Sequence, residues 1–141
     1  MTPFLKNLNA ISRGTTLFRE EKLKEYGLTG GQVKYLFAVC NRGGVSQDEL
    51  AKTMFVNKSN VARQMSALEE GGFVRREQSA EDKRVYKVYP TRKALDLMPV
   101  IRAVNDEWKS VLCRGLTDED TERLSAVLEK MVANIRGEEG Q

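Results

Sequence analysis

Apolar side chains recur every three or four positions through most of the chain, the spacing that places them on one face of an α-helix. The pattern predicts a first helix over about 3–25 and a last helix that begins at Thr117. Four more helices are predicted to begin near residues 29, 46, 57 and 91. Between the fourth and fifth helices, alternating positions predict two strands, 73–77 and 85–89. The expected fold class is therefore mainly α with a small β wing.

Capping signals mark the predicted helix boundaries. The segments TGGQ (29–32) and SQDE (46–49) are capping boxes, in which a Thr or Ser at the helix start pairs with a Gln or Glu three positions later. Further N-caps are predicted at Thr2 (followed by Pro3), Asn57 and Thr91. Glycines within 42–44, 71–72 and at 115 are predicted to end helices.

The order of the central elements indicates a known structural motif. A short helix, a turn of a few residues, a second helix and a hairpin follow one another within residues 30–90. This is the order of a winged helix-turn-helix, which binds DNA. We therefore expect a winged helix-turn-helix DNA-binding domain over 30–90. The N-terminal helix in 1–29 and the C-terminal helices in 91–141 are expected to form a dimerisation region.

Composition narrows the function classes. None of the 141 residues is histidine, which excludes zinc sites that use histidine and catalysis by Ser-His or Cys-His pairs. We expect neither an enzyme, a metal nor a cofactor. No apolar run approaches the ~20 residues that span a bilayer, and no signal-peptide layout opens the chain, so a cytoplasmic protein is expected.

Charge is unevenly distributed along the chain. The net charge is only +3, but residues 52–64 contain three bases and no acid. A local cationic stretch suits a partner that touches one face of the protein. A solvated face is the more usual explanation of any single charged stretch, so charge alone does not establish such a partner.

The helix that follows Asn57 divides into an apolar and a polar face. Val61, Met65 and Leu68 form the apolar face and are expected in the core. The outward positions of this recognition helix hold Lys58, Ser59, Asn60, Arg63 and Gln64. Ser, Asn and Gln side chains can pair with base edges in the major groove, and Arg can bind guanine through two hydrogen bonds. We predict that these residues contact DNA; the alternative is a polar face that meets only water.

The hairpin tip, AEDKRVY (80–86), carries four consecutive charges. A cation at the tip of a wing meets the concentrated negative potential of a narrow minor groove. We predict this role for Arg84, with Lys83 beside it contacting phosphate. Asp82 can orient an arginine through paired hydrogen bonds. Its partner is predicted to be Arg84 itself or another arginine, such as Arg63 or Arg76.

Several segments together resemble one family. SQDELA (46–51), VNKSNVAR (56–63), LEEGGFVRR (68–76) and the D-x-R pattern of Asp82 and Arg84 resemble the core of MarR-family transcriptional regulators, and the flanking helices match in order and length. The resemblance implies that Arg84 enters the minor groove and that Asp82 braces it or a recognition-helix arginine. It implies base contacts by Ser59, Asn60, Arg63 and Gln64.

Two departures from the family pattern lie at the junctions of the domain. Phe55 occupies a turn position where small residues are usual, which predicts either a wider turn or a ring that packs inward. Pro90 and Ala94 replace the usual leucine and glycine around Thr91. The resemblance therefore leaves open how the wing joins the long helix.

The terminal helices carry more apolar surface than a winged unit of this size can cover. They bury one another within the chain, build a dimer interface, or do both. The resemblance favours a homodimer, which as a repressor would read palindromic operator DNA with two recognition helices about 34 Å apart. The predicted interface residues are Phe4, Leu5, Leu8, Leu124, Val127, Leu128, Met131 and Ile135.

A small aromatic or phenolic effector is also implied by the resemblance, bound where the dimer helices meet the DNA-binding domain. Candidates to line such a crevice are Arg13, Phe18, Tyr35 and Trp108, with Arg13 pairing with an anionic ligand. Plain core or surface positions are the alternative explanation for each of these residues.

Two further alternatives concern the mode of action. Cys40 and Cys113 stand far apart without a CxxC motif. They are expected to be inert, although a redox-sensing regulator would need one of them exposed and reactive. A winged helix can also serve as a protein-binding adaptor without specific DNA binding.

Overall fold

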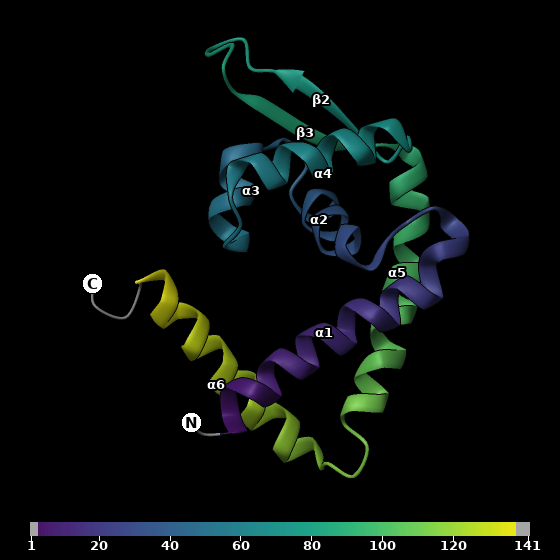
Figure 1. Ribbon diagram of the computed structural model, residues 1–141, viewed down its shortest axis with the longest axis vertical. Coiled ribbons are helices and arrows are strands. Elements are labelled where there is room, and N and C mark those ends of the chain that lie inside the picture. Colours follow the sequence, from purple (N-terminus) through teal and green to yellow (C-terminus); the bar gives the residue numbers. More distant parts are fainter. Residues whose placement is uncertain (1–2, 138–141) are drawn as a thin grey trace. The chain divides into compact units, whose positions relative to one another are not determined.

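The computed structural model describes residues 3–137, which include six α-helices and one small sheet (Figure 1). The chain divides into two compact units. A first unit ends at Asn105, and a second unit begins at Asp106. The fold class expected from the sequence is confirmed by this mainly helical architecture.

The first unit begins with α1 (Pro3–Leu23) and a short 3-10 helix (Lys24–Tyr26), which together cover the predicted first helix. The winged region follows. Its elements are α2 (Gly30–Asn41), β1 (Val45–Ser46), α3 (Gln47–Met54), α4 (Lys58–Glu70), β2 (Val74–Gln78) and β3 (Tyr86–Pro90). The helix α5 (Arg92–Leu112) then runs from the first unit into the second.

Capping predictions hold where they can be checked. The Ser46 hydroxyl accepts a hydrogen bond from the amide of Glu49 at 3.0 Å, and the Glu49 carboxylate accepts one from the amide of Ser46 at 3.4 Å. The side chain of Asn57 caps α4 by accepting from the amide of Asn60 at 2.7 Å. Thr2, predicted to cap the first helix, lies outside the described residues. Local sequence thus determines where α3 and α4 begin.

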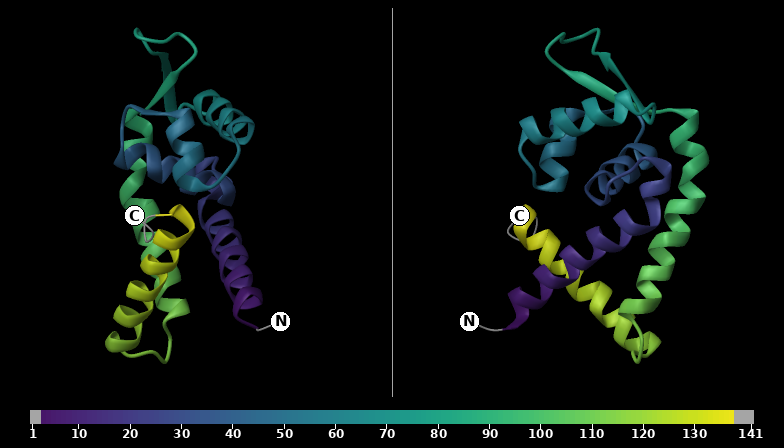
Figure 2. Two further views of the ribbon diagram at one scale, coloured as in Figure 1. Left: turned by 90° about the vertical axis from the view of Figure 1, so that its left-hand side faces the viewer. Right: turned by 45° about the vertical axis from the view of Figure 1, so that its right-hand side comes forward.

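The sheet has one more strand than predicted. The three antiparallel strands are ordered β1-β3-β2, with Val45 opposite Val88 in the central strand. The wing itself is the β2–β3 ribbon, which projects beyond α3 and α4 (Figures 1 and 2). A two-residue strand such as β1 is too short to show a period in the sequence, which explains why it was not expected.

Each helix of the winged region packs the side chains of one face into the core of the first unit. Val61, Met65 and Leu68 of α4 are fully buried, as predicted. They pack in one cluster with residues of α2, the sheet and α5, including Leu36, Val88 and Ile101. Because these three positions of α4 face the core, its other face is directed outward.

Phe55, in the turn before α4, has a strained backbone conformation. Phe55 adopts a left-handed conformation (φ 58°, ψ 42°) at the end of α3, and its amide donates to the carbonyl of Ala51. Its side chain remains 52% exposed. Residues 55–57 separate α3 from α4, and the Phe55 ring does not pack fully inward. Left-handed backbone costs a bulky residue roughly 1–2 kcal/mol, a strain that this turn carries.

The junction between the wing and α5 is pinned by Thr91. Its hydroxyl donates to the carbonyls of Gly72 and Phe73 at 2.6 and 3.1 Å, and accepts from the amide of Ala94 at 3.4 Å. Ala94 is fully buried. Thr91 thus caps α5 as predicted, and the departures at Pro90 and Ala94 leave a well-connected junction.

A close approach of two backbones joins α1 to α2. A β-carbon added at Gly30 would lie 2.0 Å from the carbonyl oxygen of Thr16. Glycine at this position allows α1 to lie against the start of α2, which helps bring Leu23 into the core. In the same unit, Arg19 of α1 donates to the side chain of Asn105 in α5 at 3.0 Å.

The second unit contains the end of α5, a turn near Gly115 and α6 (Asp118–Arg136). The hydroxyl of Thr117 caps α6 by accepting from the amide of Asp120 at 3.1 Å. Among the described residues of this unit none is buried, although α6 has an apolar stripe. Over residues 3–137, no helix is both long and apolar enough to cross a bilayer.

Candidate nucleic-acid interface

The outward face of α4 presents polar groups at its N-terminal end. Lys58, Ser59 and Arg63 are exposed, and Gln64 is half-buried. The Ser59 hydroxyl donates to the capping side chain of Asn57 at 2.8 Å. The Lys58 ammonium pairs with Asp48 of α3 at 3.7 Å, an exposed pair that costs little to break. Four of the predicted contact residues are thus available on one helix face.

Asn60 differs from its neighbours because both ends of its side chain have partners. Its amide nitrogen donates to the hydroxyl of Tyr35 at 3.2 Å, and its carbonyl oxygen accepts from the guanidinium of Arg63 at 3.3 Å. Asn60 is partly exposed, so it is not fully covered by protein. Its polar atoms are nevertheless engaged within the domain.

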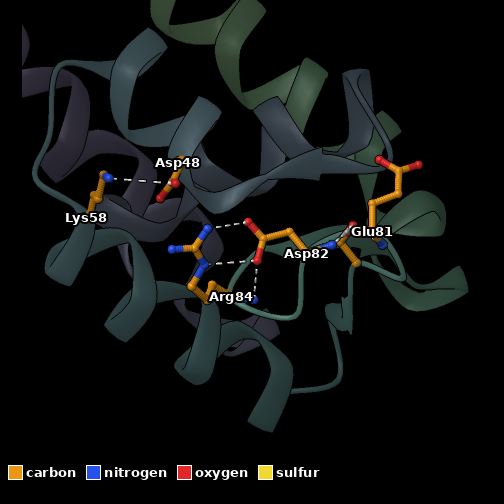
Figure 3. Close-up of polar contacts among 6 residues, drawn as sticks. Asp48, Lys58, Glu81, Asp82 and Arg84 are labelled. Atoms are coloured by element: carbon orange, nitrogen blue, oxygen red, sulfur yellow. Dashed lines mark hydrogen bonds and ion pairs between the residues drawn. The ribbon is translucent and has the colours of Figure 1, made fainter.

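The wing tip holds Arg84 against Asp82 (Figure 3). The Arg84 guanidinium donates to both carboxylate oxygens of Asp82, at 3.1 Å each, and the Arg84 amide donates to one of them at 3.0 Å. The side chain of Arg84 is 90% exposed, whereas that of Asp82 is 40% exposed. Among the partners considered for Asp82, the structure therefore selects Arg84. The guanidinium is braced yet open to solvent.

The loop under Arg84 is organised by short-range hydrogen bonds. The Ser79 hydroxyl accepts from the amides of Glu81 and Asp82, and the Gln78 side chain donates to the carbonyl of Lys83 at 3.1 Å. The Glu81 carboxylate points away from the Arg84 pair (Figure 3). The tip thus has a defined shape that presents one braced arginine.

Hydrogen bonding also sets the charge states at the tip. The side-chain and backbone hydrogen bonds from Arg84 lower the pKa of the Asp82 carboxyl, and the hydrogen bond to Asp82 raises the pKa of the Arg84 guanidinium. Both groups are therefore charged at neutral pH. A charged guanidinium beside an ionised carboxylate is the state required for paired hydrogen bonds.

Arg76 has a different partner, which the sequence did not reveal. Its guanidinium and its amide bind the carboxylate of Glu69 in α4, at 3.0–3.2 Å, and its guanidinium also donates to the side chain of Gln47 in α3 at 3.3 Å. Hydrogen bonds from Arg76 lower the pKa of Glu69. We call Gln47, Glu69 and Arg76 the wing-base cluster. It joins the wing to both helices of the helix-turn-helix.

The effector candidates are divided between the two units. Arg13 is exposed, and Phe18 is half-buried against the core of the first unit. Tyr35 is only 1% exposed, and its hydroxyl accepts from Asn60. Trp108 belongs to the second unit, where it is half-buried. Tyr35 is therefore part of the core of the winged region.

Both cysteines are half-buried and unpaired with each other. Burial raises the pKa of the Cys40 thiol, which opposes thiolate formation. Cys113 lines an open hollow of the second unit with Lys109 and Asp118. Cys40 has the environment of an inert core thiol, as expected.

Comparisons with known proteins agree with this geometry. The MarR family model matches residues 26–85. YybA, an uncharacterised helix-turn-helix-type transcriptional regulator of Bacillus subtilis, is 29% identical over 135 residues, which are 96% of this chain and 90% of that protein. A crystal structure of MarR is 32% identical, with a TM-score of 0.89 over 97% of this chain and 95% of that chain.

Similar structures include a complex with nucleic acid. It is a regulator of Listeria monocytogenes assigned to the MarR family and complexed with a 26mer DNA. It is 26% identical, with a TM-score of 0.89 over 97% of this chain and 91% of that chain. The match to the family model, the relatives and the shared fold lead to one conclusion: this chain belongs to the MarR family of transcriptional regulators, which bind DNA and are not enzymes.

Proposed function

We propose that this regulator is a cytoplasmic repressor that binds palindromic operator DNA as a homodimer. The single observation that carries the proposal is the braced, 90% exposed guanidinium of Arg84 at the wing tip. In the same unit, α4 presents Lys58, Ser59 and Arg63 on its outward face. A helix for the major groove and a cation for the minor groove are the two contacts of a winged helix on duplex DNA.

The roles that we propose for the segments of the chain follow the residue ranges expected from the sequence. Residues 30–90 bind DNA, while 1–29 and 91–141 supply the dimerisation region. Support comes from apolar side chains that the described chain leaves exposed or half-buried on α1 and α6. They are Phe4, Leu5, Leu8, Leu124, Val127, Leu128, Met131 and Ile135. An apolar stripe of this length is expected to be covered by a second copy of the chain.

Relief of binding by a small aromatic or phenolic effector is also part of the proposal. Such a ligand acts only if it binds the DNA-competent and DNA-incompetent forms with different affinities. Its support is the family alone. Addition of candidate phenols to an operator-binding assay tests this part directly.

Duplex binding is tested by titrating salt. The chain is expected to bind a duplex selected from a random-sequence pool, and its affinity should fall steeply as salt rises. If each protomer neutralises about three phosphates, the logarithm of affinity should fall with the logarithm of salt at a slope near −5. Fluorescence anisotropy of the labelled duplex measures this slope. A protein-binding adaptor would instead show negligible duplex affinity at every salt concentration.

Dimerisation is tested by placing a charge in the apolar stripe of α6. Leu128→Glu is expected to convert the dimer into a monomer, because burial of an unpaired carboxylate in an apolar interface is costly. Light scattering at a fixed protein concentration measures the change. Ala126→Glu adds the same side chain on the opposite, exposed face of α6 and should remain dimeric. Equal masses for the wild type and Leu128→Glu would contradict the proposed interface.

A further inference from the structure

The hydroxyl of Tyr35 lies where the core of the winged region meets the recognition helix. Tyr35 belongs to α2, and its side chain is among the largest that are fully buried. The hydroxyl accepts a hydrogen bond from the amide nitrogen of Asn60 in α4 at 3.2 Å. A buried phenol without a partner costs free energy, and burial raises the pKa of Tyr35 so that the phenol stays protonated. The pair thus ties a rigid core position to the outward face of α4.

Asn60 is also hydrogen-bonded to Arg63, which lies one helical turn further along α4. Arg63 is exposed, and its guanidinium donates to the carbonyl oxygen of Asn60 at 3.3 Å. Arginine can only donate, so the carbonyl end of the Asn60 amide must face Arg63 and the nitrogen must face Tyr35. This orientation agrees with the contact to Tyr35. The two hydrogen bonds therefore support the same placement of Asn60.

Engagement at both ends changes what Asn60 can do on DNA. Recognition of adenine by asparagine uses the nitrogen and the oxygen of the amide together. In Asn60 these atoms bind Tyr35 and Arg63. Arg63, by contrast, keeps most of its guanidinium donors for a ligand, because arginine has five. Arg63 therefore keeps the two donors that a paired contact with guanine needs.

We propose that Asn60 is a positioning residue, anchored on the buried Tyr35 hydroxyl, that holds the Arg63 guanidinium ready for one guanine of the operator. A free arginine side chain has many rotamers, and fixing one of them before binding lowers the entropic cost of the contact. The specificity at that base pair then depends on all three residues, although only Arg63 touches the base. This inference rests on the proposed function.

The test is a set of double-mutant cycles on base preference. The variants are Tyr35→Phe, Asn60→Ala, Arg63→Ala and their double combinations. Each variant is tested on the selected duplex and on duplexes substituted at each position.

Tyr35→Phe removes one oxygen from the core and should lower the preference for guanine at the base pair that Arg63 contacts about three- to tenfold. Asn60→Ala should lower the preference at the same position. Tyr26→Phe, at an exposed tyrosine outside the core, is the matched control and should change nothing.

Coupling separates positioning from a merely structural role. In the Arg63→Ala background, the additional Tyr35→Phe or Asn60→Ala change should alter base preference by less than about twofold. Asn60→Asp keeps an acceptor for Arg63 and can accept from the Tyr35 hydroxyl, so it should retain the guanine preference even though the added negative charge weakens binding to every duplex.

Three results overturn the inference. Asn60→Ala could shift preference at a base pair other than that of Arg63, which would make Asn60 a reader. Tyr35→Phe could leave every base preference unchanged. Tyr35→Phe or Asn60→Ala could also change base preference as much in the Arg63→Ala background as in the wild type. If the wild type binds no duplex at all, the proposed function fails instead, and this outcome is seen before any variant is made.

Discussion

Replacement of Arg84 with alanine is expected to lower the affinity of the dimer for its operator about 100-fold, roughly tenfold for each protomer. The guanidinium is the group that the wing tip presents, and Asp82 holds it through both carboxylate oxygens. A guanidinium that is already held by Asp82 loses little side-chain freedom when it enters a narrow minor groove. Little of the free energy of the contact is therefore offset by lost side-chain entropy. The Arg84 side chain is 90% exposed, so its removal should not change the melting temperature.

Two matched variants separate charge from geometry at the wing tip. Arg84→Lys keeps the charge but cannot make the two-pronged contact with Asp82, so its affinity should lie between those of the wild type and Arg84→Ala. Glu81→Ala removes a neighbouring carboxylate that points away from the pair and should leave binding equal or slightly tighter (Figure 3). Anisotropy measures the affinities, and light scattering confirms the dimer. Equal operator affinity for Arg84→Ala and the wild type would show that the wing does not bind DNA.

Replacement of Gly30 with alanine is expected to lower the free energy of unfolding by about 3 kcal/mol, near the upper end for overpacking. The added β-carbon would lie 2.0 Å from the carbonyl oxygen of Thr16 and 2.9 Å from its carbonyl carbon. Backbone atoms cannot rotate away as a flexible side chain can. The helix α1 must therefore move from α2, which disturbs the burial of Leu23 in the core.

Gly31 provides the control for this prediction within the same helix. A β-carbon at Gly31 meets nothing within 4 Å, and the backbone there is helical. Gly31→Ala should therefore raise the free energy of unfolding, by up to about 1 kcal/mol, because alanine favours helix more than glycine does. Urea denaturation at one protein concentration measures both variants. Equal midpoints for the two variants would show that α1 and α2 do not approach this closely.

Much of the fold was predictable because its signals are local. The capping boxes at Ser46 and Thr29, the cap at Asn57 and the glycines near 71–72 lie within a few residues of the boundaries they define. Helical spacing placed Val61, Met65 and Leu68 in the core correctly. The pair of Asp82 and Arg84 was also accessible, since two residues separated by one position meet within a single turn.

Other features of the site depend on residues that are distant in the chain. Tyr35 and Asn60 are 25 positions apart, and Gln47 and Arg76 are 29 apart. No sequence period links such pairs. They meet only because α2, α3, α4 and β2 pack around one core. The same reason applies to β1, which exists through its pairing with β3.

By itself, the sequence determined the helices, the wing and the identity of the groups on the outward face of α4, because propensity, capping and periodicity act over a few residues. The tertiary structure decided what those groups are free to do. It left Arg84 and Arg63 exposed, directed Arg76 to Glu69, and engaged both ends of the Asn60 amide. Hydrogen-bond partners are chosen by distance in space, and that distance is known only once the core has packed.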